Sequence, residues 1–138
     1  MAVIPANLNG VVVEFKSQVN NSVDQRIVDS LKTVIQPNIS AAHSLSKIFV
    51  SSANDQHEAP SRHVSGQGKA VDISRINGKK MSVYYPSDSA VKSIVEAIQT
   101  AFEDCTHRRE NFGPYIKKKH GKAWSVGGHA DHIHLSVD

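Results

Sequence analysis

The dipeptide Asn77-Gly78 constrains the fold more than any other feature of the sequence. Two runs with the composition of β-strands flank it, residues 70–76 and residues 80–85. Asn-Gly between such runs predicts a β-hairpin with a type I′ turn, because both central residues of that turn need a positive φ. A hairpin makes its strands antiparallel neighbours, so the chain cannot form a doubly wound parallel sheet.

Further strands and helices follow from local patterns. Residues 10–15 and 46–52 have the β-branched, apolar composition of strands. Apolar residues recur at helical spacing after the capping residues Asn20-Asn21-Ser22, until Pro37 ends the run. A second amphipathic helix is predicted after Pro86-Ser87-Asp88, ending near Cys105.

Residues 107–128 are basic, and we expect them to form loops before a strand at the end of the chain. The resulting order of elements predicts one α+β domain over residues 1–138. We expect a small antiparallel sheet with two main helices packed on one face. The other face would form a groove that a substrate can reach.

The composition limits the classes of partner. A net charge of +3 and a pI of about 9.1 favour polyanions, without choosing among nucleic acid, an anionic cell wall and acidic lipid. The single cysteine, Cys105, excludes an internal disulfide and argues against a thiolate metal site, and we expect it to be a core or helix-end thiol. No secretory signal and no apolar run of membrane-spanning length is visible, so we expect synthesis in the cytoplasm without membrane insertion.

Three of the eight histidines fall within six positions near the C-terminus. If this run is a strand, His132 and His134 project on one side, whereas Ile133 and Leu135 project on the other. Two neighbouring imidazoles on a rigid element indicate a metal site. Zinc fits best, because imidazole and carboxylate are its usual ligands besides thiolate.

Further ligands must come from elsewhere in the chain. Residues 61–72 supply candidates, because His63 precedes a glycine-rich turn and Asp72 follows that turn in an apolar run. The loop and the start of the strand could therefore bring both side chains to one ion.

These two clusters resemble the signatures of a group of zinc peptidases. The group unites D-alanyl-D-alanine carboxypeptidases, L-alanyl-D-glutamate endopeptidases, penicillin-insensitive murein endopeptidases and lysostaphin-like enzymes. Its first signature is Ser-x-His-x-x-Gly-x-Ala-x-Asp, and the matching residues are Ser61, His63, Gly66, Ala70 and Asp72. Its second ends in His-x-His or has an acid three residues before the ligand histidine, and the run Asp131-His132-Ile133-His134 satisfies both versions.

The resemblance implies a zinc ion held by His63, Asp72 and His134 in the groove, with water as the fourth ligand. The first histidine and the aspartate are nine positions apart here instead of seven. A loop with Gly66 and Gly68 can absorb two extra residues at low steric cost. The insertion leaves open whether Ser61 or Ser65 matches the serine of the signature.

The same resemblance implies catalytic roles for Asp131 and His132. Asp131 matches the acid of the group, whereas His132 would face the ligands from a regular strand. We name both, with Asp131 slightly favoured as the general base. His129 resembles the extra active-site histidine of the murein endopeptidases, and His129, Ser61 and Arg62 are the candidate substrate-binding residues.

The predicted function is hydrolysis of a peptidoglycan (murein) amide bond that involves D-amino acids, in a stem peptide or a cross-link. Endopeptidase and carboxypeptidase activity both stay open. Without a signal, the chain resembles a bacteriophage endolysin or a virion-borne enzyme that acts in the periplasm or cell wall. We expect a monomer.

Two alternatives come from other classes. The domain could be a non-catalytic zinc module that binds a cell wall or a partner, as the hedgehog signalling domains resemble these peptidases. A site without catalytic activity has no need of the extra acid and histidine, and their presence in this chain argues against this alternative. The basic stretch 108–122 could instead bind nucleic acid, but it lacks interleaved aromatic residues and a recognisable recognition element.

Overall fold

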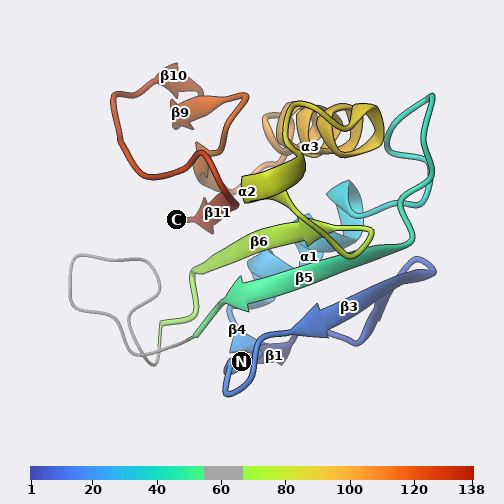
Figure 1. Cartoon of the computed structure of the whole chain (residues 1–138). Coiled ribbons are helices and arrows are strands. Elements are labelled where there is room, and N and C mark those ends of the chain that lie inside the picture. Colours follow the sequence, from blue (N-terminus) through green and yellow to red (C-terminus); the bar gives the residue numbers. More distant parts are fainter. Residues whose placement is uncertain (55–66) are drawn as a thin grey trace.

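The structure, a computed structural model, describes residues 1–54 and 67–138 (Figure 1). Its elements in chain order are β1 (Ala2–Val3), β2 (Asn7–Leu8), β3 (Val11–Phe15), β4 (Ser22–Val23), α1 (Gln25–Val34), β5 (Lys47–Ser52), β6 (Ala70–Ile76), β7 (Lys79–Lys80), α2 (Met81–Tyr84), α3 (Ser89–Phe102), β8 (Arg108–Phe112), β9 (Lys117–Lys119), β10 (Lys122–Ala123) and β11 (Ile133–Val137).

The main sheet has nine strands, in the order β10-β9-β8-β11-β6-β5-β3-β2 with β7 paired to β6. The prediction of an α+β fold with a small antiparallel sheet is confirmed in part, because the fold is mixed and the sheet is mostly antiparallel. The sheet is larger than expected and contains one parallel pair, β3 with β5. These two strands run parallel because α1 lies between them in the chain and carries it back to the same end of the sheet.

The hairpin predicted at Asn77-Gly78 is present. Asn77 has a φ of 53° and Gly78 a φ of 77°, as a type I′ turn requires. The predicted return strand over residues 80–85 is wrong, because the chain leaves the sheet after Lys80 and forms α2. Met81, which is fully buried, begins this helix, so the chain leaves the edge of the sheet to place this side chain in the core.

Both predicted helices form, with shifted ends. Asp24 caps α1, because its Oδ1 accepts a hydrogen bond from the Arg26 amide at 2.9 Å. The predicted capping residue Ser22 instead lies in β4, where it pairs with Val3 of β1. Asp88 caps α3 as predicted, accepting from the Val91 amide at 3.0 Å, and the helix ends at Phe102.

The prediction of loops over residues 107–128 is wrong, because β8, β9 and β10 occupy much of this stretch (Figure 1). Strand β8 lies inside the sheet between β9 and β11. The sequence of β8 does not alternate between apolar and polar residues, because both faces of this strand carry polar side chains. Asn111 binds Gln99 of α3, whereas Glu110 binds Ser136 and His134.

One cluster of buried apolar side chains links α1, α3 and the sheet. Figure 1 shows α1 behind β5 and β6, and both α1 and α3 contact β11. Within β11, Ile133, Leu135 and Val137 belong to this cluster. His134 and Ser136 alternate with them and therefore project from the opposite face of the sheet.

Candidate functional site

The candidate site is built on three neighbouring strands, β6, β11 and β8. His134 in the middle strand is directly opposite Asp72 of β6 and Phe112 of β8. Directly paired residues of neighbouring strands point to the same face, so these three side chains form a row across the sheet. Glu110 and Ser136, each two positions away along its own strand, lie in the adjacent row.

His134 lies between two carboxylates. Its Nδ1 is 2.9 Å from Oδ1 of Asp72, and its Nε2 is 2.9 Å from Oε1 of Glu110. The residue is only 8% exposed. Both polar atoms of a nearly buried ring are thus engaged, and the direction of each ring nitrogen is defined.

The charges in this row depend on one another. Burial lowers the pKa of His134, but its hydrogen bonds to Asp72 and Glu110 outweigh burial and raise the pKa to about 9. Burial raises the pKa of Glu110, but the hydrogen bonds from His134 and Ser136 bring it down to about 2. At neutral pH His134 is therefore a cation between anionic partners, and a metal ion that binds Nδ1 must displace its proton.

His132 reaches the same aspartate from the residue before β11. Its Nε2 is 4.0 Å from Oδ2 of Asp72, and its Nδ1 is 2.7 Å from Oδ1 of Asp131. The Asp131 side chain is 63% exposed, compared with 22% for His132. Asp131 therefore lies on the rim and orients the His132 ring, whose other nitrogen points into the site.

His129 completes the histidine cluster. Its ring centroid is 4.9 Å from that of His132, 5.6 Å from that of His134 and 5.2 Å from that of Phe112. Burial, followed by the charges of His132 and His134, lowers the pKa of His129. Its buried Nδ1 has no hydrogen-bond partner in the described part of the chain, so this atom can bind a ligand.

The structure thus brings together Asp72, His129, His132 and His134, with Asp131 beside them. The other predicted site residues, Ser61, Arg62 and His63, lie outside the described residues. Within residues 1–54 and 67–138, no group of three His, Cys, Asp or Glu side chains is arranged to hold a metal ion.

The donors that are described fit zinc. Asp72 supplies a carboxylate, and His134 directs Nδ1 toward it. Histidine ligands of zinc usually donate the N–H of their other ring nitrogen to a carboxylate, and Glu110 is placed to accept that bond. The buried, unbonded Nδ1 of His129 adds a free polar group beside this pair.

Sequence reasoning missed Glu110, Ser136 and Phe112. Phe112 stacks on the His134 ring, with centroids 5.7 Å apart and planes 17° apart. Ser136 could have been found, because it lies two positions after His134 in the same alternating run. Glu110 and Phe112 fall in a stretch that shows no strand periodicity, so no local signal placed them near the histidines.

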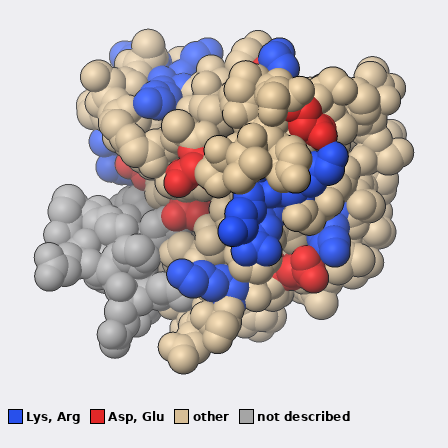
Figure 2. All heavy atoms as spheres, in the orientation of Figure 1, with Lys and Arg blue, Asp and Glu red and all other residues tan. Residues whose placement is uncertain are grey.

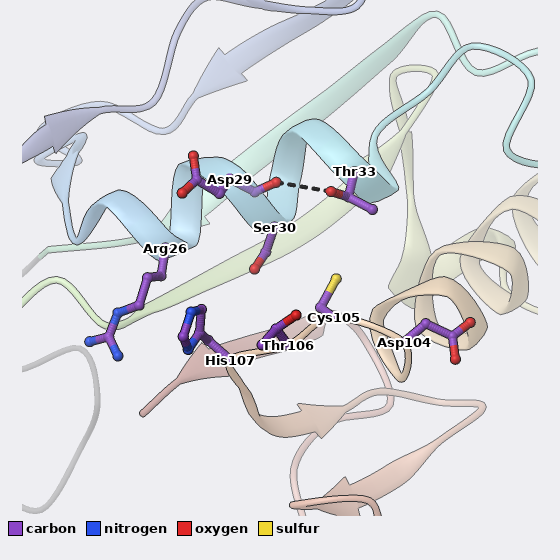
Figure 3. Close-up of a pocket in the computed structure, with 8 residues that line it drawn as sticks. All are labelled: Arg26, Asp29, Ser30, Thr33, Asp104, Cys105, Thr106 and His107. Carbon is purple, nitrogen blue, oxygen red and sulfur yellow. Dashed lines mark hydrogen bonds between the residues drawn. The ribbon is translucent and has the colours of Figure 1, made fainter.

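A separate pocket lies between α1 and the segment that follows α3 (Figure 3). It is lined by Arg26, Asp29, Ser30, Thr33, Asp104, Cys105, Thr106 and His107. The predicted burial of Cys105 is confirmed, and burial raises the pKa of its thiol, which makes it a poor nucleophile. Basic and acidic side chains are mixed in this pocket, so its charge favours no class of ligand.

Figure 2 shows basic and acidic side chains interspersed on one face of the molecule.

No protein-family model matches this chain, and comparisons with curated proteins and with solved structures also gave no match. None of the described helices is long and apolar enough to cross a membrane.

Proposed function

We propose that this protein is a zinc-dependent peptidoglycan peptidase that hydrolyses a stem-peptide or cross-link amide bond involving D-amino acids. The observation that supports the proposal most is the arrangement of His134, with Nδ1 directed at Asp72 and Nε2 held by Glu110. In zinc sites the ring nitrogen that does not bind the metal usually donates to a carboxylate, a carbonyl or water, as Nε2 of His134 does to Glu110.

In this proposal Asp72, His134 and the sequence-predicted His63 hold the ion. A zinc ion bound there supplies Lewis-acid chemistry that suits amide hydrolysis. The helices α1 and α3 contact β11, whose core-facing apolar side chains project from the face opposite His134. The face that carries Asp72 and His134 then forms the groove for the substrate.

The proton transfers are assigned to His132, with Asp131 as its partner. Asp131 accepts a hydrogen bond from Nδ1 of His132, which leaves Nε2 free to take a proton from the attacking water and return it to the leaving amine. This assignment reverses the slight preference for Asp131 that the sequence suggested. The free Nδ1 of His129 would bind the substrate or the developing oxyanion.

The remaining parts of the proposal come from the resemblance and the charge. A basic chain is attracted to an anionic cell wall. We propose a monomer that acts in the periplasm or cell wall, as a bacteriophage lysis enzyme or as a virion-borne enzyme.

The test is digestion of purified peptidoglycan by the zinc-loaded protein, with mass spectrometry of the new termini. We expect new amine and carboxyl ends that disappear after chelation and in His134→Ala. His120→Ala is the matched control, because the half-exposed ring of His120 bonds to Asp138. This variant should retain activity. Intact murein from a protein that binds one zinc ion would instead indicate the non-catalytic module.

A further inference from the structure

Glu110 has a defined place beside the candidate site, although neither the sequence motifs nor the resemblance points to it. It lies on β8, and its Oε1 is 2.9 Å from Nε2 of His134. That nitrogen is on the side of the ring opposite the one that faces Asp72. The carboxylate of Glu110 therefore contacts the ring of a proposed zinc ligand on the side away from the ion.

We propose that Glu110 is a positioning residue of the metal site, which accepts a hydrogen bond from Nε2–H of His134 and so keeps Nδ1 available to the ion. The inference rests on the proposed zinc site. A neutral imidazole offers a metal only the nitrogen that lacks a proton. An acceptor fixed at Nε2 selects the tautomer in which this nitrogen is Nδ1.

Glu110 is itself held in place from the neighbouring strand. The hydroxyl of Ser136 donates to Oε1 of Glu110 at 2.9 Å and accepts from the Glu110 backbone amide at 2.9 Å. The register between β8 and β11 shifts next to Ser136, which directs the Glu110 amide to the serine side chain. Ser136 is fully buried, so this pair of bonds is shielded from water.

Phe112 completes the support of the ring. It lies on the same strand as Glu110 and stacks on His134 at a centroid distance of 5.7 Å. Stacking restrains the plane of the imidazole, and Glu110 sets its direction within that plane. Strand β8 therefore supplies two of the contacts that orient the proposed ligand.

The experiment measures zinc affinity by competition with a chelator, together with the visible spectrum of the cobalt-substituted protein. Glu110→Ala should raise the zinc Kd roughly 10–100-fold and alter the cobalt spectrum, since loss of an outer-shell partner usually has this effect. Glu110→Gln keeps an acceptor oxygen and should recover part of the lost affinity. Glu96→Gln is the matched control on α3, where Glu96 binds Tyr85, and it should leave the zinc Kd unchanged.

Ser136→Ala gives a second, milder test, because it removes the hydroxyl that holds Glu110 but leaves both site carboxylates. It should raise the zinc Kd by less than Glu110→Ala does. Circular dichroism and thermal unfolding show whether each variant folds. If Glu110→Ala does not fold, the zinc affinities of Glu110→Gln and Ser136→Ala provide the test.

Two outcomes are distinguishable. Folded Glu110 and Ser136 variants with the zinc affinity and cobalt spectrum of the unchanged protein would overturn this inference and leave the proposed function standing. If the protein without any substitution binds no zinc, the proposed function itself is overturned.

Discussion

The three histidines of the site differ in what their surroundings allow them to do. His134 has Nε2 bonded to Glu110, an arrangement that suits a ligand binding through Nδ1. His132 has one nitrogen bonded to Asp131 and the other directed at Asp72, which suits proton transfer. His129 keeps a buried Nδ1 without a described partner, which suits contact with a substrate.

The roles of His132 and Asp131 can be separated by mutation. If His132 is the base, His132→Gln should lower kcat roughly 10²–10⁴-fold and leave the zinc Kd unchanged. Asp131→Asn, which alters only the orientation of the ring, should lower kcat less. Murein hydrolysis rates and zinc titrations of both variants are the measurement. A larger loss in Asp131→Asn than in His132→Gln would show that Asp131 is the base, and His120→Gln serves as the control.

At the scale of elements, single polar side chains begin helices and join elements together. Asp24 and Asp88 cap α1 and α3. Asp88 was visible as a capping signal before its apolar run, whereas the sequence placed the first cap at Asn20-Asn21-Ser22 instead of Asp24. Gln99 is different, because it is a fully buried polar residue within α3 that bonds to the chain after β8. Sequence periodicity gives no sign of such a link.

The cap of α1 should make stability depend on pH. Hydrogen bonds with Arg26 lower the pKa of Asp24 to about 2, below its ordinary value of 3.8. The stabilisation is therefore present above pH 3.8 and is lost as the pH falls through 2. Asp24→Asn keeps a capping side chain but loses the charge, and should cost about 1 kcal/mol at pH 7.

Urea unfolding of the protein and of Asp24→Asn at pH 7 and near pH 2 tests this expectation. The difference in unfolding free energy should shrink at the lower pH. Asp29→Asn, at an exposed position of the same helix, is the control. An equal difference at both pH values would show that the charge of Asp24 does not contribute.

The Gln99 network should be costly to remove. The side-chain amide donates to Asn111 Oδ1 and the Ile116 carbonyl, and its oxygen accepts from the amides of Tyr115 and Ile116. Gln99→Leu removes all four bonds, and the Ile116 carbonyl then keeps only its bond from the Gly113 amide. The loss should destabilise the protein by roughly 3–5 kcal/mol. Urea unfolding measures the loss, and Gln25→Leu at the surface of α1 is the comparison. A loss below about 1 kcal/mol would contradict the expectation.

At the scale of the whole molecule, the proposed ligands come from distant parts of the chain. Asp72 and His134 are 62 positions apart and meet only when β6 pairs with β11. An ion that binds both stabilises the folded state, because the unfolded chain does not hold them together.

Zinc should therefore raise the unfolding temperature. At a free zinc concentration of about 100 times Kd, the stabilisation is about 2.7 kcal/mol, which corresponds to roughly 10 °C for a domain of this size. Calorimetry with zinc and then with excess EDTA should show the shift and its reversal. His134→Ala should lose most of the shift, and an undiminished shift in that variant would place the zinc elsewhere.

The sequence by itself determined the elements whose signals are local. The type I′ hairpin, the two amphipathic helices, the cap of the second helix and the alternation of β11 could be read directly, because turns, caps and apolar periodicity depend on neighbouring residues. The grouping of His129, His132 and His134 followed from their proximity in the chain. Asp72 was a candidate because it follows the glycine-rich turn, and the resemblance then implied that it is a zinc ligand.

Only the tertiary structure decided where β8 lies. Glu110 is 24 positions from His134 in the sequence, and its strand has polar contacts on both faces, so no periodic pattern marks it. Its role appears only when β8 pairs with β11 in one register. Strand order and register are set by packing over the whole sheet, which the local pattern of residues does not encode.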